Sequence, residues 1–205
     1  MADQYSRTRL LIGNDGMEKL RGARIALFGL GGVGGYVVEA LARSGVGALT
    51  LVDHDTISIT NINRQLLALN STIGQKKVDV ARQRIADISN DIRVDTLDIL
   101  INQETVSKII EIKPDFVVDA IDSLNPKVCL IETLVKNNIP FVSCMGAALK
   151  TKANLIQVEK MKNPRNDPLA GFIRKYLRRR GVPLDFKVVY SPELSKDKSK
   201  LAMPE

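Results

Sequence analysis

Three glycines in the spacing Gly29-x-Gly31-x-x-Gly34 constrain this chain more than any other feature of its sequence. An apolar run of strand length, residues 23–28, leads directly into them, and residues 36–42 have the apolar spacing of a helix. Glycines between a strand and a helix permit a tight turn and let phosphate oxygens approach backbone amides at the helix N-terminus. The segment therefore predicts a nucleotide-binding site. The simpler interpretation is a turn that only packs a helix on a sheet.

Strands and helices are expected to alternate along most of the chain. Residues 48–52 have the pattern of a second buried strand and complete a β-α-β unit. The same alternation continues with helices at 77–88, 104–112 and 126–136 and strands at 92–97, 115–118 and 140–144. Because parallel strands need a crossover connection, this order predicts an α/β fold with a Rossmann-like, doubly wound, mostly parallel sheet flanked by helices.

The pattern changes after Gly146. A strand at 153–158, a helix at 169–180 and a short strand at 186–190 predict a mixed C-terminal extension of the sheet. Before the first strand, a short helix is expected at 15–20. The 205 residues can bury such a sheet as one domain, and the sequence has no internal repeat or linker that favours a second.

Hydropathy and cysteine content favour a soluble cytoplasmic protein. No apolar run approaches the length of a membrane span, and the N-terminus lacks the basic-then-apolar order of a secretory signal. The two cysteines, Cys129 and Cys144, form neither a metal-ligand spacing nor a disulfide framework. We therefore expect a protein of a reducing compartment with no membrane span.

The charge of the chain favours a polyanionic partner. The formal net charge is +7 and the isoelectric point is near 9.5. Neutralising phosphates releases counterions, so such a surface binds nucleic acid in a salt-dependent way. Around Ile173 and Leu177, helical spacing gathers five basic residues: Arg174, Lys175, Arg178, Arg179 and Arg180. This helix either faces nucleic acid or is simply solvated.

An acidic residue and a set of amide and cationic side chains follow the glycine motif. Asp53 ends the second expected strand, where a carboxylate can hydrogen-bond a ribose. Residues 61–65 (NINRQ) and Lys77 then supply donors beside the glycine turn. A triphosphate needs such donors and a metal ion, because helix-terminal amides contribute only about half a unit charge. These residues favour ATP over a dinucleotide. A solvated helix face is the other interpretation of Arg64 and Lys77.

Two aspartates follow the fourth expected strand, at the carboxyl edge of the sheet where ligands of such folds bind. Asp122 is placed to hold Mg²⁺, which prefers oxygen ligands and bridges to phosphates. Asp119 is expected to cap the following turn instead. Cys144 follows a strand at the same edge and could supply a thiol. However, buried cysteine commonly behaves as a small hydrophobe, and Cys129 lies in an apolar pattern.

Several segments together resemble a known family, in order and in spacing. The similarity is to the adenylation domain of the ubiquitin-activating-enzyme-like superfamily, the ThiF, MoeB and HesA group, over residues 5–190. The segments that carry it are Arg7, 29–34 (GLGGVG), 51–55 (LVDHD), 61–65 (NINRQ), 74–77 (GQKK) and 118–123 (VDAIDS). The resemblance implies an enzyme that uses ATP and Mg²⁺ to activate a carboxylate as an acyl-adenylate.

The resemblance also implies roles for individual residues. Gly32 would contact phosphate, Asp53 the ribose, and Asp122 the Mg²⁺ ion. The residues implied to bind the nucleotide are Gly29, Gly31, Gly32, Gly34, Asp53, Asn61, Arg64, Gln65 and Lys77. Those implied in catalysis are Arg7, Arg64, Lys77 and Asp122. Arg7 would reach the nucleotide of the neighbouring subunit in a homodimer.

Within the superfamily, further segments are similar to the tRNA threonylcarbamoyladenosine dehydratases. They are 7–13 (RTRLLIG), 143–147 (SCMGA), 167–170 (DPLA), 174–180 (RKYLRRR) and 188–193 (VVYSPE). The family implies a tRNA partner rather than DNA, with ATP used to close the threonyl carboxylate of the modified adenosine into a ring. The substrate's own carbamoyl oxygen would close that ring, so the resemblance demands no enzyme nucleophile. Whether a sulfurtransferase assists is left open.

Two other functions remain as alternatives. An adenylyltransferase that activates the C-terminus of a ubiquitin-like sulfur carrier would usually have paired Cys-x-x-Cys zinc ligands, which this sequence lacks. An NAD-dependent oxidoreductase would need a catalytic group on the hydride side, and the lone histidine, His54, has no evident partner. The expected domains are a ThiF-type adenylation domain at 1–194 and a polar tail at 195–205. The C-terminal portion usual in the family is expected to be missing.

Overall fold

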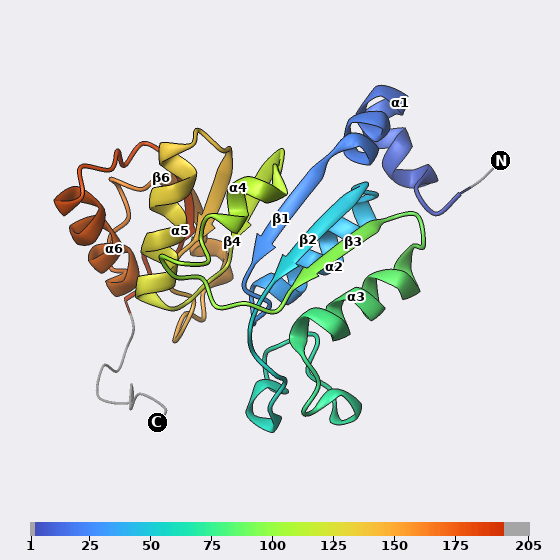
Figure 1. The fold of residues 1–205 in the computed structure, drawn as a ribbon, viewed down its shortest axis with the longest axis horizontal. Coiled ribbons are helices and arrows are strands. Elements are labelled where there is room, and N and C mark those ends of the chain that lie inside the picture. The colour runs from blue at the N-terminus through green and yellow to red at the C-terminus, as the bar shows by residue number, and fades with distance from the viewer. Residues whose placement is uncertain (1–2, 195–205) are drawn as a thin grey trace.

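A single sheet with helices on both faces forms the molecule, as Figure 1 shows. The computed structural model describes residues 3–194, so the tail expected at 195–205 lies outside the described residues. The strands are β1 (Arg24–Phe28), β2 (Ala48–Val52), β3 (Arg93–Leu97), β4 (Phe116–Asp119), β5 (Phe141–Cys144), β6 (Gln157–Lys160) and β7 (Lys187–Tyr190). The helices are α1 (Ser6–Gly22), α2 (Gly34–Ser44), α3 (Lys77–Ile88), α4 (Lys108–Ile112), α5 (Leu124–Lys136) and α6 (Pro168–Arg179).

The strand order explains where a ligand site can form. It runs β3-β2-β1-β4-β5-β7-β6, and every neighbouring pair is parallel except β6 with β7. From β1 the chain proceeds outward to β2 and β3, then returns to place β4 on the other side of β1. At such a switch point the loops after the two central strands diverge and leave a crevice. The predicted doubly wound, mostly parallel sheet with a mixed C-terminal extension is confirmed.

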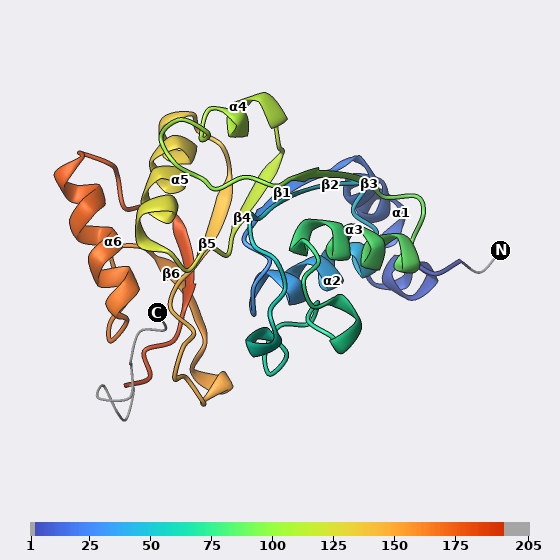
Figure 2. The ribbon, with the colours of Figure 1, turned by 60° about the horizontal axis from the view of Figure 1, so that its bottom comes forward.

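Alternating side chains of the central strands build two apolar layers. Leu27 of β1 packs with α2 and α3 on one face, whereas Ala26 and Phe28 pack with α4 and α5 on the other. Figure 2 shows α4 on the opposite side of β1, β2 and β3 from α2 and α3. A further cluster joins α5 and α6 to β7, with Ile173 and Leu177 of α6 fully buried. These layers hold the carboxyl ends of β1 and β4 rigidly side by side.

The helix before β1 is longer than expected. The sequence predicts residues 15–20, whereas α1 runs from Ser6 to Gly22 with a kink at Gly13 (φ 72°, ψ 178°). Only Met17 of this helix is buried, so the apolar periodicity that signals a helix is nearly absent. Within the described residues, no helix is long and apolar enough to cross a membrane.

Two other predicted elements are wrong in their bounds. The helix expected at 104–112 is reduced to α4, because the Asn102 side chain accepts bonds from the amides of Glu104 (2.9 Å) and Thr105 (3.0 Å). Such local side-chain bonds compete with helix formation. The strand expected at 153–158 is a 3-10 turn at Ala153–Leu155 followed by β6, which starts at Gln157. As an edge strand, β6 lacks the alternation of a half-buried strand.

Candidate active site

The glycines between β1 and α2 form two pairs that differ in the space available for a side chain. At Gly34, a β-carbon would lie 1.8 Å from the carbonyl oxygen of Gly29. At Gly29, which has a φ of +88°, it would lie 2.8 Å from the carbonyl oxygen of Ala120. These two positions tolerate only glycine, because the turn is tight and the helix packs closely on the sheet.

The other pair, Gly31 and Gly32, has room for a β-carbon without a clash. A β-carbon at Gly31 would have its nearest neighbour 3.9 Å away, at Nε2 of Gln65. At Gly32 the nearest atom would be the Arg64 carbonyl oxygen, 3.5 Å away. No side chain caps the start of α2. The first turn of α2 therefore leaves backbone amides and a positive dipole end available to an anion.

Asp53 follows β2 directly and links the end of this strand to the glycine loop by a hydrogen bond. Its Oδ2 accepts a hydrogen bond from the Leu30 amide at 2.6 Å, and its Oδ1 accepts one from the Asp55 amide at 2.8 Å. Both bonds orient the carboxylate at the mouth of the loop, and each oxygen keeps a second lone pair for a hydroxyl donor. This geometry fits the predicted contact with a ribose.

The turn at 61–65 brings amide groups against the glycines. Gln65 is 8% exposed, and its Oε1 has no hydrogen-bond partner among the described residues. An unpaired buried polar atom is costly, so it fits a site that a ligand completes. Asn61 is held by the Ser58 amide, which donates to its Oδ1 at 3.1 Å. Arg64 is exposed and donates to the Thr60 carbonyl at 2.9 Å, which leaves its other guanidinium nitrogens free to turn toward an anion.

Lys77 is the first residue of α3 and is 4% exposed. Its Nζ lies 2.6 Å from Oδ2 of Asp55, whose own amide is bound by Asp53. The solvated helix face considered for Lys77 is therefore wrong. A continuous chain of contacts links its ammonium through Asp55 and Asp53 to the Leu30 amide of the glycine loop.

The turn after β4 packs against the glycine loop, with the Ala120 carbonyl beside Gly29. Asp122 is exposed there, and its Oδ1 accepts a bond from Ser123 Oγ at 3.4 Å. One accessible carboxylate suits Mg²⁺, which protein sites bind through one or two carboxylates together with phosphates. Asp119 is fully buried, and its Oδ1 accepts the Ile121 amide at 3.1 Å, so the predicted capping of the turn is confirmed.

A family model described as the ThiF family matches residues 5–174. The chain belongs to the ThiF family. Its similarity to curated ThiF-family relatives extends over nearly the whole sequence. It is 42% identical to the tRNA threonylcarbamoyladenosine dehydratase of Bacillus subtilis over 193 residues, which are 94% of this chain and 76% of the relative. To the Escherichia coli enzyme of the same name it is 37% identical over 175 residues, 85% of this chain and 65% of the relative.

Solved structures agree with this similarity. The structure of E. coli tRNA N6-threonylcarbamoyladenosine dehydratase, TcdA, in complex with ATP matches with a TM-score of 0.90 at 34% identity, covering 94% of this chain and 82% of that one. The AMP complex matches with a TM-score of 0.92 at 33% identity, covering 97% and 84%. A relative from the other branch, the E. coli molybdopterin-synthase adenylyltransferase, is 34% identical over 154 residues, 74% of this chain and 61% of the relative.

One predicted residue of this ThiF-family chain does not lie at the site. Arg7 is exposed on α1, which lies beyond the amino end of β1, whereas the glycine loop follows its carboxyl end (Figure 1). Tyr5 packs on Gly45, just after α2. The 11 residues of α2 thus separate the start of α1 from the glycine loop, a distance of about 16 Å at the helical rise per residue. Within one chain, Arg7 cannot serve the nucleotide site.

The surroundings of the two cysteines and of the histidine in this ThiF-family chain do not indicate a catalytic role. Burial raises the pKa of the Cys144 thiol and also that of the Cys129 thiol. A raised pKa keeps a thiol protonated and weakly nucleophilic at neutral pH, which agrees with a structural role. The His54 side chain is 52% exposed, with Nε2 3.4 Å from Oδ1 of Asp55.

Helix α6 is the predicted basic helix, but among the described residues only some of its basic side chains lack a partner. Arg180 forms an ion pair with Glu132 at 2.6 Å, and Arg174 donates to the Met161 carbonyl at 3.4 Å. Lys175, Arg178 and Arg179 are exposed, and within residues 3–194 no carboxylate lies within ion-pair distance of them.

Sequence reasoning missed one buried cation. Lys127 of α5 is 0% exposed, and its Nζ lies 2.8 Å from Oδ2 of Asp119. A signal was available, since Lys127 stands among Leu124, Val128 and Ile131 on the apolar stripe of its helix. A lysine on such a stripe is buried and paired, or it would break the core.

Proposed function

We propose that this chain is an ATP-dependent tRNA threonylcarbamoyladenosine dehydratase. The observation that carries the proposal is the match, over 94% of the chain, to a dehydratase solved with ATP. Separately, Gly31 and Gly32 lie beside residues 64–65, and Lys77 is linked to the glycine loop through Asp55 and Asp53, which supports a phosphate site formed by these residues. The E. coli adenylyltransferase covers less of the chain at lower identity than the Bacillus dehydratase, so activation of a sulfur carrier is the weaker alternative.

The reaction has two steps. The threonyl carboxylate attacks the α-phosphorus of ATP, which forms an acyl-adenylate and expels pyrophosphate. The carbamoyl oxygen of the same substrate then attacks the acyl carbon and expels AMP, and a carbamoyl N–H releases its proton. One carboxyl oxygen thus leaves with AMP, and together with the released proton this leaves the product lacking one water. AMP leaves far more readily than oxide, which is why the carboxylate must first be adenylated. No protein nucleophile is required, in keeping with the protonated Cys144.

The residues act mainly by stabilising charge on the phosphates. In our proposal, the amides of Gly31 and Gly32 contact phosphate oxygens, and Asp53 accepts the ribose hydroxyls. Lys77 and Arg64 neutralise the charge that develops as pyrophosphate leaves. The orphaned Oε1 of Gln65 gains a donor from the bound nucleotide or from an ordered water. Asn61 and the glycines at 29 and 34 hold the loop in shape.

Mg²⁺ would be held by Asp122, with phosphate oxygens completing its coordination. When bound, the ion supplies Lewis-acid stabilisation of the phosphates. The Asp122 carboxylate is accessible at the edge where the triphosphate would lie, and its one weak bond to Ser123 leaves it able to ligate.

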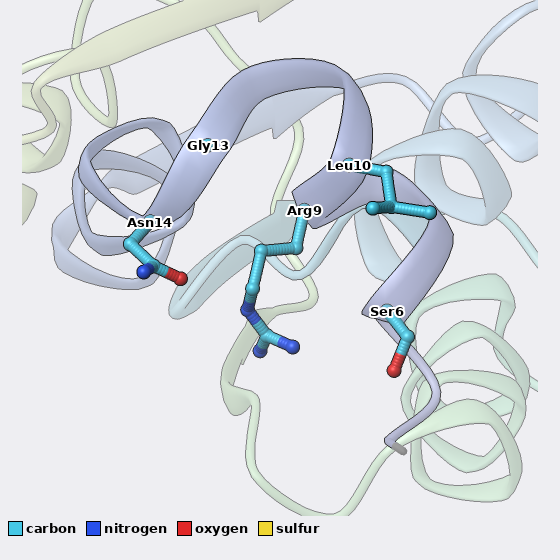
Figure 3. A pocket seen from close by; sticks show the side chains of 5 residues that line it. All are labelled: Ser6, Arg9, Leu10, Gly13 and Asn14. Carbon is cyan, nitrogen blue, oxygen red and sulfur yellow. The ribbon is translucent and has the colours of Figure 1, made fainter. Parts of the chain in front are cut away.

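A homodimer would bring Arg7 to the site. Because Arg7 lies about one helix length from its own glycine loop, only a second copy can present it to the nucleotide. The same helix exposes Leu10 (88%) and Leu11 (84%), apolar side chains that a partner would cover. Beside them lies an open pocket of about 510 Å³, lined by Ser6, Arg9, Leu10, Gly13 and Asn14. Figure 3 shows Arg9 and Asn14 on the same side of the kinked segment.

The tRNA would lie across the face of α6. Lys175, Arg178 and Arg179 have no carboxylate partner within the described residues, and Phe172 beside them is 55% exposed. Exposed cations interleaved with an aromatic ring suit a phosphate backbone and an unstacked base. We also propose that residues 1–194 form the adenylation domain and that the enzyme works in the cytoplasm, where tRNA is modified. A sulfurtransferase partner stays a prediction.

The test is mass analysis of tRNA nucleosides. Purified protein, ATP and Mg²⁺ are incubated with tRNA that carries threonylcarbamoyladenosine, and the tRNA is then digested. The expected product is the modified nucleoside lacking one water, with none formed when ATP is omitted. Asp122→Ala and Arg64→Ala should abolish it, whereas Arg82→Ala, an exposed arginine paired with Asp79 on α3, should not. An unchanged nucleoside with the wild-type protein contradicts the proposed function.

A further inference from the structure

A fully buried ion pair lies directly behind the candidate active site. Lys127 and Asp119 are both 0% exposed, and their charged atoms are 2.8 Å apart. Ser143 Oγ donates to the same Asp119 oxygen at 2.6 Å. Burying two charges is costly unless hydrogen bonds satisfy the remaining donors and acceptors. The contacts of this pair therefore indicate what it holds in place.

Those contacts converge on the turn after β4. Asp119 Oδ1 accepts the Ile121 amide at 3.1 Å, and Lys127 Nζ donates to the Ile121 carbonyl at 2.8 Å. Both polar groups of Ile121 are thus bound by the two members of the pair. The residue on one side, Ala120, has its carbonyl where a β-carbon at Gly29 would clash. The residue on the other side is Asp122, the proposed Mg²⁺ ligand.

We propose that Lys127 is a positioning residue of the active site. Its ammonium fixes the Ile121 peptide, and through that peptide it sets the direction of the Asp122 carboxylate and the close packing of the turn on Gly29. The inference rests on the proposed function, because it concerns the same Mg²⁺–ATP site. Lys127 itself does not touch substrate, since it is buried behind the turn.

The inference has a specific physical consequence. Among residues 3–194, Asp122 makes only one weak side-chain bond, to Ser123 at 3.4 Å, so its orientation depends on the backbone that carries it. Outer contacts that orient a metal ligand commonly change metal affinity by about 10- to 100-fold. Loss of the Lys127 contact should therefore weaken Mg²⁺-dependent ATP binding more than it weakens ATP binding without Mg²⁺.

The experiment measures ATP binding by calorimetry at increasing Mg²⁺ concentrations. For Lys127→Met, we expect the Mg²⁺ concentration that gives half-maximal enhancement of ATP binding to rise by about tenfold. Lys127→Arg, which keeps a charged donor, should recover part of this loss. Lys136→Met is the matched control, since Lys136 lies on the same helix but is exposed and paired with Glu132. It should behave as the wild type does.

A second variant separates positioning from folding. Lys127→Met alone leaves Asp119 buried and uncompensated, which can unfold the chain, whereas Asp119→Asn with Lys127→Met removes both charges and should fold. The double variant still lacks the donor to Ile121, so it should keep the raised Mg²⁺ requirement with a melting temperature near that of the wild type. If it folds and responds to Mg²⁺ like the wild type, the inference is wrong. If the wild-type protein itself binds no ATP, the proposed function fails instead.

Discussion

Gly34 packs so closely on Gly29 that a β-carbon at position 34 would lie 1.8 Å from the Gly29 carbonyl oxygen. The glycine motif therefore has two physically distinct functions. Gly29 and Gly34 allow the helix to approach the strand, whereas Gly31 and Gly32 leave room for a ligand. The two pairs should respond differently to the addition of one methyl group.

For Gly34→Ala we predict a destabilised protein, because the methyl group can be accommodated only by moving backbone. Overpacking of this kind costs about 2 kcal/mol or more, which in a chain of this size lowers the melting temperature by roughly 5 °C or more. Gly31→Ala should melt near the wild type but bind ATP more weakly, since its methyl group would occupy ligand space. Thermal melts and ATP titrations measure both effects. Equal melting temperatures for the two variants would contradict the distinction between packing glycines and ligand-facing glycines.

Lys77→Met should leave a folded protein with impaired catalysis. In the part of the chain that the structure describes, its ammonium is paired only with Asp55, which is half exposed, so the fold loses little when the charge is removed. Loss of a cation that stabilises the departing pyrophosphate commonly costs about a hundredfold in turnover. Initial rates at saturating ATP test this expectation. Wild-type turnover in this variant would show that Lys77 takes no part in the proposed reaction.

Cys144→Ala is predicted to keep activity within about twofold, because the proposed reaction uses no protein nucleophile and a protonated thiol is weakly nucleophilic. Burial raises the pKa of this thiol, so it is protonated at neutral pH and unsuited to covalent chemistry. The measurement is the rate of nucleoside dehydration, with Cys129→Ala as the matched control. Loss of activity only in the Cys144 variant would show that the thiol takes part.

The exposed ion pair between Arg24 and Asp115 should make the stability of the folded protein depend on pH in the acidic range. The Arg24 guanidinium and backbone amide lower the pKa of Asp115 to about 2. Its ordinary value in an unfolded chain is about 3.9. The pair therefore stabilises the fold fully above about pH 4, and this contribution is lost as the pH falls toward 2. The melting-temperature difference between the wild type and Asp115→Asn should shrink over that interval. A constant difference would contradict the assignment.

Replacing Lys175, Arg178 and Arg179 together by Gln should weaken tRNA binding and flatten its salt dependence. Each phosphate contact contributes about 0.7 to 0.9 to the slope of log affinity against log salt, so the slope should fall by about 2. Lys160→Gln is the control, because Lys160 is already neutralised by Asp185 at 2.8 Å. Filter binding at several salt concentrations gives the slopes. An unchanged slope in the triple variant would exclude α6 from the RNA surface.

Most of the fold could be predicted from the sequence, because buried parallel strands and their crossover helices have strong apolar patterns. The glycine spacing predicted the tight turn between β1 and α2, and the strand pattern placed Asp53 and Asp122 just after β2 and β4. The length of α1 was underestimated, since most of its residues are exposed and only Met17 is buried. The edge strand β6 was misplaced for the same reason.

The contacts between distant segments could not be predicted. Nothing in the pattern around residue 77 reveals that Lys77 meets Asp55, because the pairing depends on how the 53–76 segment returns to the sheet. Equally, the burial of Lys127 depends on the exact packing of α5 against β4 and β5. Arg7 could be assigned a role only through family resemblance, since it belongs to α1, which lies at the opposite end of β1 from the glycine loop.

The exchange of labelled pyrophosphate into ATP tests the central claim most directly, because only a reversible adenylation step produces it. Our account predicts exchange when the protein is given Mg²⁺ and tRNA that carries threonylcarbamoyladenosine, and none with the same tRNA lacking the threonylcarbamoyl group. Exchange that instead required a carrier protein ending in Gly-Gly, or tight binding of NAD with no response to ATP, would contradict it.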